Sequence, residues 1–144
     1  MAESKNESSR VTSVHHVVFA VPPEQLPETV QLFSELGFQF QTIELEDVGL
    51  QVLLDWDGGL ELVTPLPSQP DEAGAVAQFL ERNGPGVYSV VIRVGDAPAA
   101  EQVALRYGAQ TRFHQHRGGD GFELEEIELA VLGLPLTLLS TELP

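Results

Sequence analysis

Four residues of this chain have side chains suited to catalysis or ligand binding. Two lie in the first half of the chain and two at matching places in the second half. The segment "VHHVVFAV" near the N-terminus resembles "VYSVVIRV" in the second half, and aligning the two sets His16 against Ser89. The later segments "GLELV" and "PLTLL" set Glu61 against Thr137. Imidazole and carboxylate can transfer protons or bind a divalent metal ion, whereas hydroxyl groups are poor ligands for such ions. The first half of the chain therefore carries a potential reactive pair, His16 and Glu61.

The elements around these residues repeat in the same order, which predicts two copies of the unit βαβββ. In the first copy we expect a strand over 14–21, a helix over 27–36 and strands over 38–45, 50–56 and 60–64. In the second copy we expect a strand over 87–94, a helix over 97–107 and strands over 110–116, 122–131 and 135–140. Gly37 and Gly108 end the two helices, since glycine accepts the left-handed conformation found there.

A chain of 144 residues has the size of one ordinary domain. We expect a flexible arm over 1–10 and a single domain over 11–144, with module one at 14–64, a linker and short helix at 65–86, and module two at 87–140. The predicted fold class is α+β, in which the paired βαβββ modules form a cleft between two curled mixed sheets. Exposed strand edges in such sheets favour a homodimer.

The net charge of −15 is unevenly spread, because residues 11–81 contain no lysine or arginine. Such a chain repels nucleic acid and anionic lipid, and it offers little to the phosphates of a CoA ester. We therefore expect a small-molecule ligand that is neutral or cationic. The sequence has no cysteine and no apolar run long enough for a membrane span, so we expect a cytoplasmic protein without disulfides or thiolate sites.

Three motifs, "HHVVFAV", "LELVTPLP" and "AVAQFLERNGPGVYSVVIRV", together with the two glycine-ended helices, resemble the vicinal oxygen chelate superfamily. This superfamily includes glyoxalase I, extradiol dioxygenases and bleomycin-type resistance proteins, and the motifs are most similar to methylmalonyl-CoA epimerase. The resemblance implies that four strand positions converge on a divalent ion that polarises a substrate carbonyl. His16 and Glu61 match two of these ligands, while Ser89 and Thr137 stand where the family usually has histidine and glutamate.

Three hypotheses follow from this incomplete ligand set. In the first, a divalent metal ion binds weakly at His16 and Glu61 and gains a further ligand from His114, His116 or His15. In the second, no metal is bound and the protein is an enzyme that uses His16 and Glu61 for acid and base catalysis. In the third, the cleft only binds a cationic or aromatic compound, as in the resistance proteins. We favour an isomerase-, epimerase- or lyase-like enzyme that moves a proton next to a carbonyl group, and we keep the binding protein as the alternative.

The favoured hypothesis assigns a role to each candidate residue. Glu61 is the base and His16 is its partner or a residual metal ligand. Ser89 and Thr137 donate hydrogen bonds to substrate oxygens. Trp56, the only tryptophan, and His114 are further candidates for ligand contact.

Two further expectations concern side chains outside this set. Tyr88 points opposite to Ser89 by strand alternation, so we expect it to pack against a helix. Four glutamates of the 122–131 segment are expected to form one solvated strand face. They are Glu123, Glu125, Glu126 and Glu128.

Overall fold

A computed structural model describes residues 12–66, 74–119 and 122–141. The predicted arm over 1–10 and most of the predicted linker lie outside the described residues. The chain forms two compact units, one over His16–Ser89 and the other combining the residues before His16 with those after Ser89. None of the helices in the described ranges is long and apolar enough to cross a membrane.

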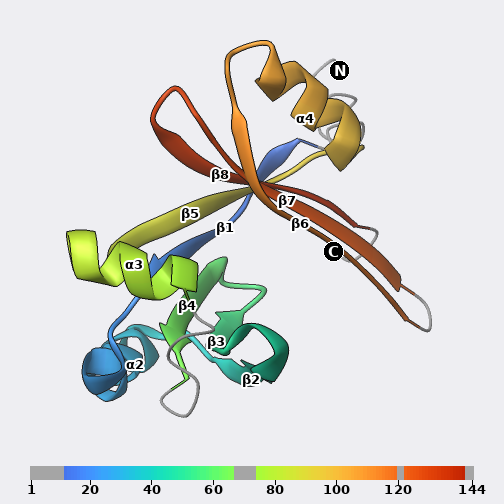
Figure 1. The fold of residues 1–144 in the computed structure, drawn as a ribbon. Coiled ribbons are helices and arrows are strands. Elements are labelled where there is room, and N and C mark those ends of the chain that lie inside the picture. Colours follow the sequence, from blue (N-terminus) through green and yellow to red (C-terminus); the bar gives the residue numbers. More distant parts are fainter. Residues whose placement is uncertain (1–11, 67–73, 120–121, 142–144) are drawn as a thin grey trace. The chain divides into compact units, whose positions relative to one another are not determined.

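The first unit contains most of β1 (Ser13–Ala20), three further strands, two α-helices, two 3₁₀ helices and the first half of the fifth strand. Apart from β1, the complete elements are α2 (Leu26–Leu36), β2 (Gln41–Leu45), β3 (Leu50–Asp55), β4 (Leu60–Pro65) and α3 (Gly74–Asn83), with the 3₁₀ helices at Pro23–Gln25 and Glu46–Val48. The strand order is β2-β3-β4-β1, with β1 parallel to β4 and the other neighbours antiparallel (Figure 1). Gly37 ends α2 with a φ of 118°, as its place after the apolar stripe predicted.

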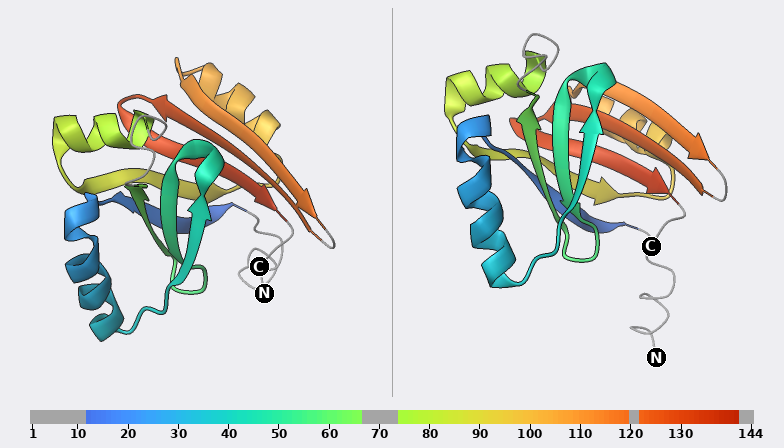
Figure 2. Two further views of the ribbon diagram at one scale, coloured as in Figure 1. Left: turned by 60° about the horizontal axis from the view of Figure 1, so that its bottom comes forward. Right: turned by 90° about the horizontal axis from the view of Figure 1, so that it is seen from below.

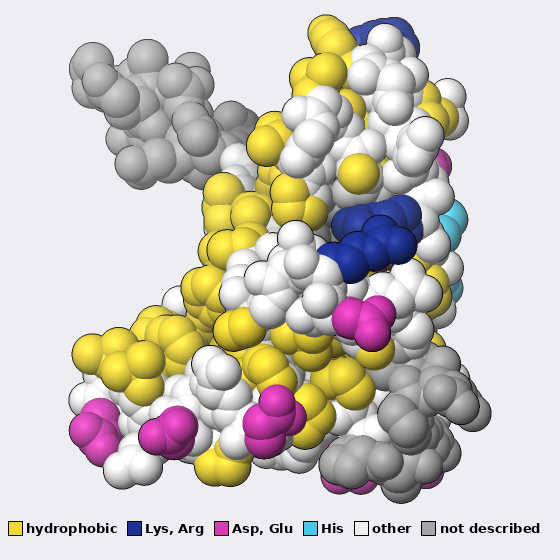
Figure 3. Space-filling model, turned by 60° about the vertical axis from the view of Figure 1, so that its left-hand side comes forward, with side chains coloured by type: hydrophobic (Ala, Val, Ile, Leu, Met, Phe, Trp, Pro, Cys, Tyr) yellow, Lys and Arg dark blue, Asp and Glu magenta, His cyan; other side chains and the backbone are white. Residues whose placement is uncertain are grey.

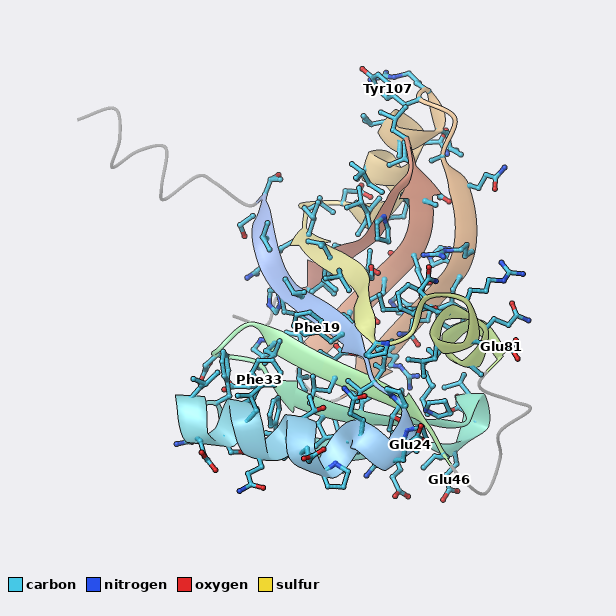
Figure 4. All side chains as sticks on the ribbon, turned by 90° about the vertical axis from the view of Figure 1, so that its left-hand side faces the viewer. Phe19, Glu24, Phe33, Glu46, Glu81 and Tyr107 are labelled. Atoms are coloured by element: carbon cyan, nitrogen blue, oxygen red, sulfur yellow. The ribbon has the colours of Figure 1, made fainter. Side chains whose placement is uncertain are left out.

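The core of this unit lies between its sheet and α2. Leu62 of β4 pairs with Phe19 of β1 and with Leu53 of β3, so the three side chains share the face that α2 covers. Phe33 of α2 stacks on Phe19 with ring centroids 6.1 Å apart, and Figure 4 shows the two rings facing one another. Because alternate residues point to opposite faces, the neighbouring positions in β1 and β4 face away from α2.

The outer side of α2 mixes charge with apolar surface. Leu32 and Leu36 are exposed, and Figure 3 shows acidic side chains beside apolar ones over the part of the surface where α2 lies. The other helix of this unit, α3, packs the ring of Phe79 on the first residues of the strand that follows it, β5 (Gly86–Arg93). The rings of Phe79 and Tyr88 meet edge to face at 5.4 Å, which confirms that Tyr88 packs against a helix.

The second unit contains the second half of β5 together with one helix and three further strands. The elements are β5 (Gly86–Arg93), α4 (Ala97–Leu105), β6 (Gln110–Gly119), β7 (Phe122–Val131) and β8 (Leu134–Thr141). The strand order is β5-β8-β7-β6, with β5 parallel to β8. Figure 2 shows β6, β7 and β8 side by side with α4 along one face. Ile127, Leu129 and Leu138 form the buried core beneath this helix.

The predicted α+β class with two βαβββ modules is confirmed, with differences at element ends. The strand expected from residue 38 begins at Gln41, because Phe38 and Phe40 turn their rings onto Phe33 of α2. The helix expected to reach residue 107 ends at Leu105, and a turn continues to Gly108 with a φ of 84°. The strand expected to end at residue 116 continues to Gly119, since β7 offers it partners up to that residue, with one bulge between Thr111 and Phe113.

Candidate functional site

The strand register places the four candidate residues at equivalent positions of the two modules. In the first module Val18 of β1 pairs with Glu61 of β4, and His16 stands two residues before Val18. In the second module Val91 of β5 pairs with Thr137 of β8, and Ser89 likewise stands two residues before Val91. The equivalence proposed from sequence alone therefore agrees with the pairing within each module.

The first module joins its two candidate residues directly. His16 Nε2 lies 2.9 Å from Glu61 Oε1, with the His16 side chain 2% exposed and the Glu61 side chain 19% exposed. In the tautomer that carries the proton on Nε2, the imidazole donates this bond and the carboxylate accepts it. Hydrogen bonds with an ionised partner are stronger than neutral ones, and this one orients the carboxylate while Oε2 remains to meet a ligand.

The pair lies on a mostly apolar face, where Gln41 of β2, the partner of Leu54, is a further polar residue. Val18 is buried on this face, and Leu54 of β3 pairs with Glu61 from the other side. The ring of Trp56 lies 5.8 Å from the His16 ring and is tilted by 41°. Apolar neighbours exclude water and strengthen the remaining electrostatic interactions. The face can therefore hold an apolar or planar group of a ligand beside one hydrogen-bonded carboxylate.

The turn that carries Trp56 is held by a residue that sequence reasoning missed. The Asp55 carboxylate accepts hydrogen bonds from the backbone nitrogen of Gln39 at 2.9 Å and from that of Gly58 at 2.8 Å. These two bonds, the one from Gln39 first, hold the pKa of Asp55 below its usual 3.8. A Cβ on Gly58 would lie 2.7 Å from Asp55 Oδ2 and 2.8 Å from Phe38 Cδ1, so a larger residue there would displace one of these side chains. The segment "DWDGG" contained the signal, since Asp commonly bonds to a backbone nitrogen in turns.

In the second module the sheet brings a carboxylate next to Thr137. Glu128 of β7 pairs with Thr137, and its Oε2 lies 3.3 Å from Arg112 Nη2. The expectation of one solvated glutamate face was wrong, because alternation along β7 puts Glu126 and Glu128 on the face of Thr137 and turns the other two glutamates to the opposite face. Glu128 is thus a second candidate that the sequence reasoning overlooked.

His114 lies on the opposite face of the same sheet from Thr137. It pairs with Ile127, whose side chain belongs to the core beneath α4, whereas Thr137 pairs with the next residue, Glu128. His114 Nε2 lies 2.6 Å from Glu125 Oε2. The structure therefore does not bring His114 and Thr137 together, and ligand contact by His114 stays a prediction.

The donor set does not fit a resident divalent ion of the kind that the family resemblance implied. Within residues 12–66, 74–119 and 122–141, no group of three or more histidine, aspartate or glutamate side chains is arranged to hold a metal ion. His16 and Glu61 are good ligands, but Ser89 and Thr137 supply only hydroxyl groups at the other two positions. Protein zinc sites normally use at least three nitrogen, sulfur or carboxylate ligands. The partial metal site at His16 and Glu61 stays a prediction.

Comparisons with known proteins identify the fold. No family model and no curated protein matches the chain. Among solved structures it is similar to methylmalonyl-CoA epimerase from Mycobacterium tuberculosis, with 21% identity over 92% of this chain and 90% of that one and a TM-score of 0.63. It is also similar to a variant of the Streptomyces coelicolor epimerase in complex with 2-nitronate-propionyl-CoA, with 23% identity, coverage of 91% and 98%, and a TM-score of 0.65.

A longer protein with a different activity has the same arrangement. A mutant of 4-hydroxymandelate synthase from Streptomyces coelicolor matches with 16% identity over 91% of this chain and 49% of that one, with a TM-score of 0.67. The chain therefore has the vicinal oxygen chelate fold, as the resemblance in the sequence predicted. Because proteins with this fold include both epimerases and a synthase, the fold alone does not assign a reaction.

Proposed function

We propose that this protein is an isomerase-, epimerase- or lyase-like enzyme that moves a proton next to a carbonyl group of a small molecule. The observation that carries the proposal is the 2.9 Å hydrogen bond between His16 and Glu61 on a mostly apolar face. A carboxylate in such surroundings is a suitable base, because it is held in one orientation and little water competes for it.

Each group has a defined part in this chemistry. Glu61 Oε2 accepts the proton from the substrate carbon, the C–H bond breaks, and its electrons move onto the carbonyl oxygen to form an enolate. His16 continues to donate to Oε1 and holds the carboxylate in place. A hydroxyl donor such as Ser89 stabilises the enolate oxygen. Glu61 then delivers the proton to another carbon of the enolate, or to the other face of the same carbon after the substrate turns, and the new C–H bond gives the product. The roles predicted for Ser89 and Thr137 as donors remain part of the proposal.

The surroundings of the pair favour one class of substrate. Trp56 and its apolar neighbours suit a ligand with a planar or apolar group. One neighbour is described as methylmalonyl-CoA epimerase in complex with methylmalonyl-CoA and NH4+. A CoA ester carries phosphates, however, and residues 11–81 offer no lysine or arginine to bind them. We therefore propose a neutral or cationic carbonyl compound.

The alternative is a protein that binds a small molecule without turnover. The observation that favours it is the ring of Trp56 beside the buried His16, because an aromatic wall can hold a planar ligand whether or not a reaction follows. The two functions differ in what Glu61 must do. An enzyme needs its carboxylate to accept a proton, whereas a binding protein needs only its shape and polarity.

Hydrogen exchange in D2O tests the proposal without knowledge of the product. The protein is incubated with a panel of small neutral and cationic carbonyl compounds, and NMR follows deuterium incorporation next to the carbonyl group. Glu61→Gln should slow exchange at least about 100-fold, since a general base contributes roughly 10² to 10⁴ in rate. Glu125→Gln, the matched control in the second module, should leave exchange unchanged. Binding by the unmodified protein with no exchange across the panel would favour the alternative.

A further inference from the structure

We propose that Gln41 is a specificity-determining residue, whose carboxamide binds a neutral hydrogen-bonding group of the carbonyl compound on which Glu61 acts. The inference rests on the proposed function, because it names the substrate class for the same face of the sheet. It assigns a role to a polar side chain that the proposed reaction does not use.

Strand pairing puts Gln41 on the face of the His16 and Glu61 pair. Gln41 of β2 pairs with Leu54 of β3, and Leu54 pairs with Glu61 of β4. Directly paired residues of neighbouring strands point to the same side of a sheet, so these three side chains form one row. Neighbouring strands lie about 4.8 Å apart, which puts the Cα atoms at the two ends of the row roughly 10 Å apart. A ligand that lies over Leu54 can therefore reach both polar side chains.

The Gln41 side chain and the apolar surface beside it are open to a ligand. Gln41 is exposed, and its carboxamide takes part in no hydrogen bond within the part of the chain that the structure describes. Ile43, two residues further along β2 on the same face, is 42% exposed. Binding sites for small molecules commonly combine apolar surface with a few polar groups that fix the orientation of the ligand. This edge of the face has that combination.

The Asp55 carboxylate holds the backbone near Gln41 in place. It accepts hydrogen bonds from the backbone nitrogens of Gln39 and Gly58. Gln39 comes two residues before Gln41, at the start of β2. Gly58 belongs to the turn that carries Trp56. One carboxylate thus ties the segment that presents the amide to the segment that presents the aromatic ring, and a held backbone reduces the ordering cost of binding.

The length of the row limits the shape of the substrate. The carbon that loses its proton must come within about 3 Å of the Glu61 carboxylate, and a group bound by Gln41 lies about 3 Å from its amide. A row of roughly 10 Å then leaves about 4 Å between the two parts of the substrate, the length of about three bonds. The inferred substrate carries a hydrogen-bonding group at about that distance from the reacting carbon.

Charge favours a neutral group at this position. Residues 11–81 contain no lysine or arginine, and Glu61 already contributes a carboxylate to the face. An anionic group beside Gln41 would find no cation in this part of the chain to offset its loss of water. A carboxamide instead matches both the donors and the acceptor of the glutamine side chain.

Two ketones of equal size test the proposal. 4-Oxopentanamide carries its amide about three bonds from an exchanging carbon, and 5-methylhexan-2-one replaces that amide by an apolar group of the same shape. NMR measures deuterium exchange in D2O at several ketone concentrations and, separately, the Kd of each ketone. Gln41→Leu should raise KM and Kd of the amide about tenfold and leave kcat within twofold, because it removes hydrogen bonds made equally before and during the reaction. The values for 5-methylhexan-2-one should stay within twofold.

Thr42→Val is the matched control. Thr42 is exposed on the same strand but pairs with Leu53, on the face that α2 covers, so this variant should change neither ketone. Equal effects of Gln41→Leu on both ketones, or on neither, would overturn the proposal. An unmodified protein that binds the amide no more tightly than the apolar ketone would overturn it as well.

The same data separate this proposal from the proposed reaction. Amide binding that depends on Gln41, without exchange of either ketone, would support recognition by Gln41 and contradict the proton transfer. Exchange of both ketones that Gln41→Leu leaves unchanged would support the proton transfer and contradict the role of Gln41.

Discussion

Each module sets a histidine against a glutamate, but the two pairs lie in opposite surroundings. His16 and Glu61 occupy the face of their sheet that points away from α2, and the imidazole is buried. His114 and Glu125 occupy the face that α4 covers further along, beyond the end of the helix, and both reach solvent. The imidazole of this residue pair is therefore buried in one module and exposed in the other.

The register explains how the modules came to differ. Glu61 is flanked by Val18 and Leu54, and the equivalent residue Thr137 is flanked by Val91 and Glu128. The first module thus has its carboxylate, Glu61, on β4, whereas the second module has Glu128 on β7, the neighbour of the equivalent strand β8. This displacement leaves the alternation of both strands intact, so the apolar core beneath each helix is unaffected.

The largest difference should appear when each glutamate is removed. Glu61→Ala removes the carboxylate that a buried imidazole contacts and should lower the free energy of unfolding by about 2 kcal/mol, because the loss of a buried hydrogen bond to a charged group is costly. Glu125→Ala removes the partner of a His114 side chain that is 47% exposed and should cost less than about 1 kcal/mol. Urea unfolding of both variants measures the two values. Equal losses would show that burial does not separate the pairs.

Substitutions in the two hairpin turns should change stability by a smaller amount, and in opposite directions. The β7–β8 turn places Leu132 at a φ of 54°, where a leucine is strained, while the β3–β4 turn uses Gly59 at a φ of 77°. Leu132→Asn should raise the free energy of unfolding by up to about 1 kcal/mol, since asparagine is favoured at this position of a hairpin turn. Thermal unfolding should show a higher midpoint temperature for Leu132→Asn and a lower one for Gly59→Ala. A less stable Leu132→Asn would show that the leucine makes contacts that offset its strain.

The smallest effect should come from the exposed carboxylate that holds the Trp56 turn. The folded-state pKa of Asp55 is lowered below 3.8, so its hydrogen bonds stabilise the protein above that pH and are lost as the pH falls through the lowered value. Asp55→Asn should therefore reduce stability at neutral pH and should match the unmodified protein in strong acid. Unfolding followed by the fluorescence of the single tryptophan measures both conditions.

A neighbouring residue provides the control for this experiment. Asp57 lies exposed in the same turn, and Asp57→Asn should leave the pH dependence unchanged. A stability gap between Asp55→Asn and the unmodified protein that persists in acid would mean that the carboxylate charge is not the source of the effect. The fluorescence of the folded Asp55→Asn variant also reports whether Trp56 has left its place beside His16.

Sequence pattern alone determined the order of elements, the duplication and the equivalence of His16 with Ser89 and of Glu61 with Thr137. These features depend on local periodicity, on glycines such as Gly37 after an apolar helical stripe, and on repetition, all of which are present in the chain itself. The predicted fold was correct for that reason. Element ends were less exact, as at Gln41, because contacts with distant residues decide where a strand begins.

Only the tertiary structure decided which side chains meet. The bond between His16 and Glu61 joins residues 45 positions apart, and Asp55 at the end of β3 bonds to Gln39, 16 positions away, just before β2. The register of β7 against β8 put Glu128 next to Thr137, whereas the run of glutamates suggested one solvated face. A shift of one residue in strand pairing reverses the face of every side chain, and long-range packing of the apolar core selects the register.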